Sequence, residues 1–339
     1  MSQSRVTIRD VAEHAGVSHQ TVSRVINHSK HVAPTTREKV QASIEALDYR
    51  PNAIARSMAL GRTCLLACMA PNLTDFTFAS LVEGAEVEAR NHGYFLISSS
   101  VPTPDILENL LSELIDSRRV SGLIVINPYI DERHTYLPDN FPLVFIGSHA
   151  REDGISSVTL NDELAGYQAT QHLIGLGHRN ITMITGTMTE DCAQKRCVGF
   201  EKALKEAGIN STNRQVIEGD WSATSGRDAF LQMAAKGRLP SAVFAQNDRM
   251  AIGVMQAARD LRIPVPEQLS VIGMDDLPLA AYFDPPLTTI RQDIIKIGCK
   301  AAQLLIEKIE DPTHFTQSLT INPELVVRKS TARFQGKRR

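Results

Sequence analysis

Five polar side chains near the start of the sequence could recognise nucleic acid. They are His19, Gln20, Ser23, Arg24 and Asn27, and at helical spacing they would share the outer face of one short helix. None of the five is acidic, and their donors and acceptors suit base edges and phosphates. A solvated helix face that lacks carboxylates is the alternative interpretation, because helix-turn-helix shapes also occur as plain packing units.

A second set of polar residues could bind a small molecule. Asn127, Asn247 and Asp275 follow apolar runs of the remaining chain, and Arg196 is expected to open a helix. An arginine, amides and a carboxylate that converge on one cleft suit the recognition of hydroxyl groups. Trp221 is the only tryptophan, and its flat face could stack on a sugar ring or a base. Structural interpretations remain open: Asp275 could cap a helix, Trp221 could be core, and Arg196 could pair with a surface carboxylate.

Two short helices joined by a tight turn are predicted to position the first set. Their inward faces consist of Ile8, Val11 and Ala12 in the first helix and of Val22, Val25 and Ile26 in the second. Gly16 is expected to end the first helix in a left-handed conformation, and Ser18 is a good N-cap for the second. A third helix is predicted over Thr35 to Leu47, with Pro34 at a favourable first position and Ala33 as a poor cap. This arrangement is a helix-turn-helix.

Alternating apolar runs and amphipathic segments follow from Thr63 onwards. The expected strands are Leu65–Ala70, Tyr94–Ser98, Gly122–Ile126, Leu143–Ile146, Ile181–Thr185, Ala242–Ala245 and Ser270–Gly273. The expected helices are Phe78–Asn91, Ile106–Asp116, Asp162–Gly175, Gln194–Gly208, Gly226–Ala235 and Arg249–Leu261. Continuous apolar strands interleaved with helices indicate an α/β core of doubly wound parallel sheets, which bind ligands beyond the carboxyl ends of their strands.

The segment Thr7 to Asn27, with Val-Ser-His-Gln-Thr-Val-Ser-Arg-Val at its centre, closely resembles the headpiece of the lac repressor/galactose repressor family. The resemblance continues through His31-Val32 and through residues 36–40 and 49–52, and later motifs extend it to about residue 330. It implies an all-α headpiece and a core of two doubly wound lobes like those of periplasmic sugar-binding proteins. The implied organisation is a headpiece over residues 1–51, a hinge over 52–62, a core over 63–332 and a basic tail over 333–339. Within the core, lobe one would span about 63–161 and 293–321, and lobe two about 162–292 and 322–332.

The same resemblance implies which residues touch DNA. His19, Gln20 and Arg24 are expected to read bases of a near-palindromic operator. The expected phosphate contacts are Thr7, Ser18, Thr21, Ser23, Asn27 and His31. The segment 52–60 is too short for a stable isolated helix, so we expect it to be coil until it pairs on DNA as the family's hinge helix. Ala55 and Met58 would then meet the minor groove, with Met58 as the apolar wedge in place of the family's usual leucine; a spare apolar residue in a linker is the alternative for Met58.

For the small molecule, the family's effector site matches the motifs Arg-Cys-Val-Gly-Phe, Asn-Asp-Arg-Met-Ala and Gly-Met-Asp-Asp. The expected ligand contacts are Phe76, Phe78, Asn127, Arg196, Trp221, Asn247 and Asp275, with Asp248 and Asp276 expected to be structural. The stretch Glu218 to Ala223 resembles lac repressor, in which the tryptophan lies against the galactoside, and this favours a sugar or glycoside. Gly147 and Ile294 replace a carboxylate and an aromatic residue of lac repressor, so no particular sugar is indicated. Purine repressors carry an arginine where Glu190 stands, which disfavours a purine, although a nucleoside, a purine or another metabolite remains the alternative.

The charges are unevenly distributed along the chain. Residues 1–62 hold nine Lys/Arg against five Asp/Glu, whereas the remainder holds 27 against 33; this fits a nucleic-acid partner for the head alone. No apolar run resembles a signal peptide or a bilayer span, so a cytoplasmic protein without a membrane partner is expected. Its five cysteines are then expected to stay reduced and to bind no metal.

These features favour a ligand-responsive, sequence-specific transcriptional repressor that uses no cofactor. We expect a homodimer, because the C-terminal end lacks the heptads of the coiled coil that makes lac repressor tetrameric. A ligand between the lobes would make or break the hinge-helix pair. An enzyme with catalytic residues is disfavoured because no Gly-x-x-x-x-Gly-Lys-Ser/Thr, His-Glu-x-x-His or Gly-x-Ser-x-Gly motif is present. A transport solute-binding protein is disfavoured by the headpiece.

Overall fold

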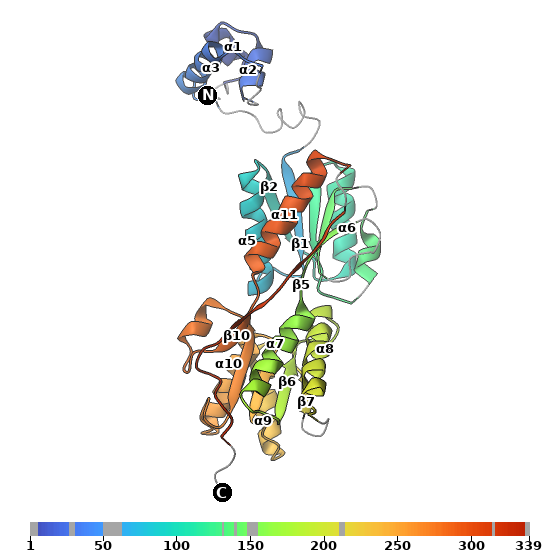
Figure 1. The fold of residues 1–339 in the computed structure, drawn as a ribbon. Helices are drawn as coiled ribbons and strands as arrows, with labels where there is room; N and C mark the ends of the chain where they lie inside the picture. Colours follow the sequence, from blue (N-terminus) through green and yellow to red (C-terminus); the bar gives the residue numbers. More distant parts are fainter. Residues whose placement is uncertain are drawn as a thin grey trace, which may run out of the picture. The chain divides into compact units, whose positions relative to one another are not determined.

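The computed structural model describes residues 6–26, 31–49, 63–130, 132–138, 141–147, 155–209, 214–313 and 316–335. The chain forms two compact units, Met1–Cys64 and Leu65–Arg339 (Figure 1). Asn27, Ala55 and Met58 lie outside the described residues, as does the expected hinge over 52–62, so the roles expected for them stay predictions. None of the described helices is both long and apolar enough to cross a bilayer.

The N-terminal unit is a three-helix headpiece. Its helices are α1 (Ile8–Ala15), α2 (His19–Ile26) and α3 (Pro34–Ala46). Its core consists of the buried side chains Val11, Ala12, Val22, Val25 and Val40. Gly16 ends α1 with a left-handed φ of 68°, and Ser18 Oγ accepts the Thr21 N–H at 3.1 Å where α2 begins. Both predictions about the helix-turn-helix turn are therefore confirmed.

The first lobe of the core is built on a six-stranded sheet in the order β11-β5-β4-β3-β1-β2. Its strands are β1 (Leu65–Ala70), β2 (Phe95–Ser100), β3 (Gly122–Ile126), β4 (Leu143–Ile146), β5 (Ser156–Leu160) and β11 (Ser318–Ile321), and all their pairings are parallel. The lobe's helices are α5 (Phe76–Asn91), α6 (Pro104–Asp116), α11 (Ile294–Glu310) and the short 3-10 helix η1 (Glu132–Tyr136). Gly84 and Gly298 bring α5 and α11 together, because a Cβ at either position would lie 2.1 Å from a carbonyl oxygen of the other helix.

The second lobe repeats this plan with the strand order β12-β10-β9-β8-β6-β7. Its strands are β6 (Ile181–Thr185), β7 (Arg214–Glu218), β8 (Ala242–Ala245), β9 (Ser270–Asp275), β10 (Thr288–Arg291) and β12 (Glu324–Val326). Its helices are α7 (Asp162–Gly175), α8 (Asp191–Glu206), α9 (Ala223–Ala235), α10 (Asp248–Asp260) and the 3-10 helix η3 (Pro278–Tyr282). Alternate strand residues face two hydrophobic clusters, one around Phe200 and Leu173 and the other around Phe230 and Val254, so the sheet is covered on both faces.

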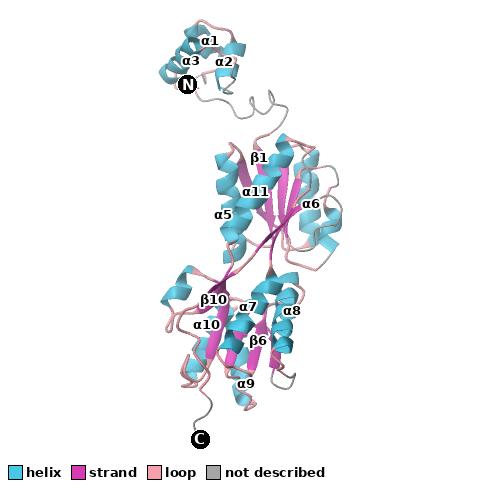
Figure 2. Cartoon of the chain, viewed as in Figure 1, coloured by secondary structure: helices cyan, strands magenta, loops and turns pink. Residues whose placement is uncertain are grey.

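Within the described residues, the chain passes between the lobes from β5 to α7, from β10 to α11 and from β11 to β12. Figure 2 shows the two sheets, each flanked by helices, with these connections between them. Segments that lie far apart in the sequence thus share each lobe, and the carboxyl ends of the strands in both sheets can line one cleft.

The fold class expected from the sequence is confirmed, with two departures. Strands β5, β7, β10, β11 and β12 were not predicted from the sequence. Each begins with a polar residue and none contains more than two consecutive apolar residues, so they lack the apolar runs that mark the other strands. In addition, β12 pairs antiparallel with β10, so the second sheet is mixed rather than purely parallel.

Candidate DNA-recognition face and ligand cleft

Helix α2 presents the expected base-reading side chains on its accessible side. His19, Gln20 and Arg24 are accessible, whereas Val22 and Val25 are buried against the other two helices. The expected phosphate contacts are partly or fully accessible: Thr7, Ser18 and His31 are exposed, and Thr21 and Ser23 are half-buried. The apolar side fixes the helix while the polar side stays available, which is the arrangement needed to enter a major groove.

The start of α1 is organised by a capping box between Thr7 and Asp10. The backbone N–H and the Oγ1 hydroxyl of Thr7 both donate to Asp10 Oδ2, at 2.7 and 2.8 Å. These hydrogen bonds lower the pKa of the Asp10 carboxyl. A phosphate contact from the Thr7 hydroxyl would therefore have to compete with its bond to Asp10.

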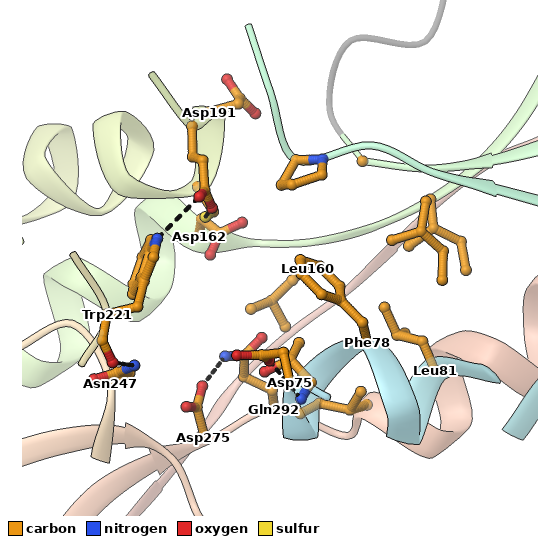
Figure 3. Close-up of a pocket in the computed structure, with 18 of the residues that line it drawn as sticks. Asp75, Phe78, Leu81, Leu160, Asp162, Asp191, Trp221, Asn247, Asp275 and Gln292 are labelled. Carbon is orange, nitrogen blue, oxygen red and sulfur yellow. Dashed lines mark hydrogen bonds between the residues drawn. The ribbon is translucent and has the colours of Figure 1, made fainter. Parts of the chain in front are cut away.

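A cleft of about 400 Å³ lies between the two lobes of the core. It is lined by segments that follow strands of both sheets, at the carboxyl ends where doubly wound folds bind ligands. Of the expected ligand contacts, Phe78, Asn127, Arg196, Trp221, Asn247 and Asp275 line this cleft. Figure 3 labels Phe78, Trp221, Asn247 and Asp275 among them. Phe76 begins α5, is 40% exposed and does not line the cleft.

Arg196 lies inside α8 rather than at its start, because the helix begins at Asp191. It is buried, and its Nε donates to Asp162 Oδ1 at 2.8 Å while its Nη1 donates to the Gln246 carbonyl at 2.8 Å. Burial raises the pKa of Asp162, and the charge of Arg196 opposes that rise. The sequence alternative of a surface ion pair is thus wrong: the arginine is held within the second lobe at the edge of the cleft.

The indole of Trp221 is fixed from several sides. Its Nε1 donates to Glu190 Oε1 at 3.0 Å, and the Trp221 carbonyl accepts from Asn247 Nδ2 at 2.9 Å. Asn247 is also the N-cap of α10, because its Oδ1 accepts the Met250 N–H at 2.8 Å. A Cβ added at Gly186 would lie 1.9 Å from the ring, so the indole needs a glycine beneath it. Asn247 therefore positions the tryptophan, whether or not it also touches a ligand.

Two carboxyl groups, Asp275 and Glu190, give the second lobe an acceptor-rich wall. Gln292 Nε2 donates to Asp275 Oδ1 at 2.6 Å, as the lower dashed line in Figure 3 shows. Burial raises the pKa of Asp275, and the neighbouring charge of Asp248 raises it further. Burial likewise raises the pKa of Glu190, against the hydrogen bond from Trp221. Both groups line the cleft, so each can form hydrogen bonds with a bound molecule, as an acceptor when ionised and as a donor when protonated.

The first lobe supplies an apolar wall. Phe78 and Leu81 of α5 and Leu160 at the end of β5 line the cleft (Figure 3). Asn127 follows β3, and its side chain exchanges hydrogen bonds with the backbone of Tyr129, accepting at 3.2 Å and donating at 3.3 Å. A ligand would therefore meet mostly hydrocarbon on this side and mostly polar groups on the other.

The two lobes touch at the rim of the cleft. Backbone hydrogen bonds of 2.9 Å run from Ile130 N to Thr189 O and from Asp191 N to Pro128 O, and Tyr129 forms an isolated β-bridge with Glu190. Asp75, the N-cap of α5, also forms an ion pair with Arg249 of α10. Glu190 thus belongs both to the ligand wall and to the contact between lobes.

Among the cleft residues that were not predicted as ligand contacts, Asp162, Glu190 and Gln292 each bond to a predicted one. Gln292 follows β10, which carried no apolar run, and Asp162 is fixed by an arginine 34 positions away. Glu190 could have been found, because it comes shortly after the predicted strand Ile181–Thr185. The sequence alone identifies this position only as one where purine repressors carry an arginine.

The described residues contain no group of three or more His, Cys, Asp or Glu side chains suited to a metal ion. All five cysteines are free thiols. Burial raises the pKa of Cys68 to about 12, so that thiol stays protonated and behaves as a small apolar side chain.

Two family models match parts of this chain. Residues 7–52 match the model described as bacterial regulatory proteins, lacI family. Residues 170–331 match the periplasmic binding protein-like domain. The first match covers the headpiece, and the second covers most of lobe two and the returning C-terminal segments.

Full-length relatives and solved structures are similar over nearly the whole chain. The HTH-type transcriptional repressor PurR of Photobacterium profundum is 36% identical over 327 residues, covering 96% of this chain and 98% of that protein. Catabolite control protein A of Priestia megaterium is 34% identical over 330 residues, covering 96% and 99%. The crystal structure of the lac repressor dimer bound to operator and the anti-inducer ONPF has a TM-score of 0.84 at 32% identity, covering 97% of this chain and 100% of that one. The complex of transcriptional regulator CelR with cellobiose has a TM-score of 0.72 at 30% identity, covering 96% and 100%.

Proposed function

This chain belongs to the lacI family of bacterial regulatory proteins and is therefore a DNA-binding transcriptional repressor with a ligand-binding core, not an enzyme, and we propose that a purine base or nucleoside is its effector. The resemblance seen in residues 7–27 is thereby confirmed. The sugar favoured by the sequence motifs becomes the second candidate.

The observation that carries the purine proposal is the pairing of flat aromatic side chains with an acceptor-rich wall in one cleft. Trp221 lines the cleft from lobe two and Phe78 lines it from lobe one. Base–aromatic stacking is worth about 1–3 kcal/mol per base by alanine substitution. The volume of about 400 Å³ lies within the range of small-molecule sites.

Relatives support the same effector class. The repressors of Photobacterium profundum and Vibrio vulnificus, each 36% identical to this chain, are both named HTH-type transcriptional repressor PurR, a name that points to a purine effector. Glu190 stands where purine repressors carry an arginine, as noted from the sequence. This change replaces a donor with an acceptor, so it alters which edge of a base is preferred and leaves the stacking surfaces in place.

A sugar remains the second candidate because of a specific observation. Asp275 and Glu190 accept hydrogen bonds, which also suits hydroxyl groups, and Trp221 can stack on the apolar face of a sugar ring. The similar regulator CelR was solved in complex with cellobiose.

On the DNA side, we propose that a homodimer places two α2 helices in successive major grooves of a near-palindromic operator. His19, Gln20 and Arg24 would read bases, and the residues proposed as phosphate contacts from the sequence would fix the register. Three large side chains of the two-lobed ligand-binding unit are exposed in the single chain: Phe95, Leu279 and Tyr282. A dimer interface buries side chains of this kind.

We propose that the effector acts by changing how the lobes meet. The bridge between Tyr129 and Glu190 joins the lobes at the cleft rim, and Glu190 also lines the ligand wall. A ligand that favours one arrangement of the lobes shifts the population toward it, to the extent that its affinities for the two arrangements differ. The hinge over 52–62 would pass that change to the headpiece.

Calorimetric titration of the full chain with guanine, adenine, hypoxanthine, galactose and cellobiose tests the effector class. We expect a purine to bind and Phe78→Ala to weaken that binding about 5- to 150-fold, as the loss of one stacking contact predicts. Phe76→Ala is the matched control, since it removes the same ring from the same helix outside the cleft. Binding of a sugar and of no purine would transfer the role to the second candidate.

A further inference from the structure

The cleft wall that contains Glu190 and Asp275 carries more carboxyl groups than cationic side chains. The carboxyl groups that line the cleft are Asp75, Asp162, Glu190, Asp191, Asp220 and Asp275, whereas the lining cations are Arg196 and Arg249. Arg196 pairs with Asp162, and Arg249 pairs with Asp75. Glu190 and Asp275 therefore have no cationic side chain as a direct partner among the described residues.

Asp275 is directed into the cleft with one oxygen available. The residue is 8% exposed and lines the cleft. Its Oδ1 accepts from Gln292, and its Oδ2 accepts no hydrogen bond from any described residue. This oxygen is not one of the fully buried unpaired atoms of the described residues, so a ligand or a water molecule can donate to it.

Glu190 leaves an acceptor in the same wall. Its Oε1 receives the N–H of Trp221 at 3.0 Å, which holds the carboxyl group beside the indole. Its Oε2 has only the Cys192 thiol, 3.9 Å away, among the described residues, and a thiol is a weak donor. A ligand stacked on Trp221 would therefore place its edge beside a fixed carboxyl group.

From this arrangement we infer that Glu190 is a specificity-determining residue that selects an effector carrying an amino group on the edge that faces lobe two. The inference rests on the proposed use of this cleft as the effector site and goes further by naming the recognised group. An exocyclic amino group donates hydrogen bonds that a carboxylate accepts strongly, whereas a carbonyl on the same edge would set two acceptors against each other. Among purines, guanine and adenine carry such an amino group, whereas hypoxanthine does not.

Pairs of compounds that differ by one amino group test this inference. We would measure dissociation constants for guanine against hypoxanthine, adenine against purine, and glucosamine against glucose. A hydrogen bond to a charged group is worth about 1.5–3 kcal/mol, so the amino member of the preferred pair should bind about tenfold or more tightly. Equal or weaker binding by the amino member in every pair overturns the inference.

The glucosamine pair separates this inference from the purine proposal. If no purine binds but glucosamine is preferred over glucose, the purine proposal fails and the role inferred for Glu190 stands. If purines bind without regard to the amino group, the purine proposal stands and the role inferred for Glu190 fails. Absence of binding by all six compounds contradicts both.

Two variants assign the preference to the residue. Glu190→Gln keeps an oxygen for the Trp221 N–H but removes the negative charge. In this variant the two members of the preferred pair should bind with nearly equal dissociation constants. Glu218→Gln is the matched control, because Glu218 is exposed, does not line the cleft, and its Oε1 accepts from Met188 N at 2.9 Å, as a glutamine oxygen would. The preference should survive in this control. A Glu190→Gln protein that folds and keeps the full preference would contradict the assignment.

Discussion

The indole of Trp221 lies so close to Gly186 that a Cβ atom at residue 186 would come within 1.9 Å of the ring. Glu190 holds the N–H of the same indole, and Asn247 holds the carbonyl of the same residue. The position of the indole in the cleft is therefore set by the absence of a side chain at Gly186 together with two hydrogen bonds. Perturbing any of these should move the ring.

Gly186→Ala should displace Trp221 and weaken effector binding about tenfold or more, as the loss of a stacking partner predicts. The chain has one tryptophan, so its fluorescence spectrum reports the displacement directly. Gly175→Ala is the control, because a Cβ there meets no atom within 4 Å. An unchanged emission spectrum in the Gly186 variant would show that the ring tolerates the methyl group.

Arg24→Ala should weaken specific operator binding by about 1–3 kcal/mol if the side chain reads a base. Effector binding by the core should not change, because Arg24 belongs to the separate N-terminal unit. Arg9→Ala removes an exposed charge of α1 and should affect specific and unrelated DNA alike. Parallel loss of operator and effector binding in the Arg24 variant would contradict the division of roles.

Arg249→Ala removes the ion pair with Asp75 that links the lobes. Because the arginine side chain is 41% exposed, its contribution should be small, about 0–1 kcal/mol, and should fade in high salt. We expect the effector to bind up to about fivefold more weakly to this variant. In the absence of effector, the distance between fluorophores placed on the two lobes should be larger in the variant than in the unchanged protein. Arg227→Ala, which breaks ion pairs within lobe two, should leave that distance unchanged.

Lobe two should lose stability in mild acid. His178 bonds to Ser241, Ser270 and the Ala332 carbonyl, and burial lowers its pKa below 6.5. The unfolded chain takes up this proton at a higher pH than the folded chain, so the stability is full above pH 6.5 and falls as the pH drops below it. The urea midpoint should therefore fall less between about pH 7.5 and 5.5 in His178→Gln than in the unchanged protein.

The exposed His92 provides the control for this titration. His92→Gln should show the same fall in urea midpoint as the unchanged protein. If the His178 and His92 variants behave alike, the acid sensitivity arises elsewhere.

The headpiece was predictable because its signals are local. The left-handed glycine at position 16 and the cap at Ser18 lie close in the sequence to the groups they serve. The apolar strands were predictable for a similar reason, since β1, β3, β4, β6 and β8 occupy the expected ranges. Strands such as β5 and β10 contain several polar residues and pair with β11 and β12, which lie far away in the chain, so their own residues do not mark them.

The candidate site was predictable in composition but not in its internal contacts. The sequence named Arg196, Trp221, Asn247 and Asp275, and all four line the cleft. It did not show that Arg196 is bonded to Asp162 and to the Gln246 carbonyl, 34 and 50 positions away. Such partners are set by the packing of α7, α8 and β8, which no local pattern contains.

The most direct test of the central claim is fluorescence anisotropy of the full chain on DNA from upstream of its own gene, with and without purines. A purine-responsive repressor should bind tightly and in a salt-sensitive manner. Guanine or adenine should change the operator affinity, whereas galactose and cellobiose should not, and the response should be lost in Phe78→Ala but kept in Phe76→Ala. Operator binding that responds to a sugar and ignores every purine would contradict the account.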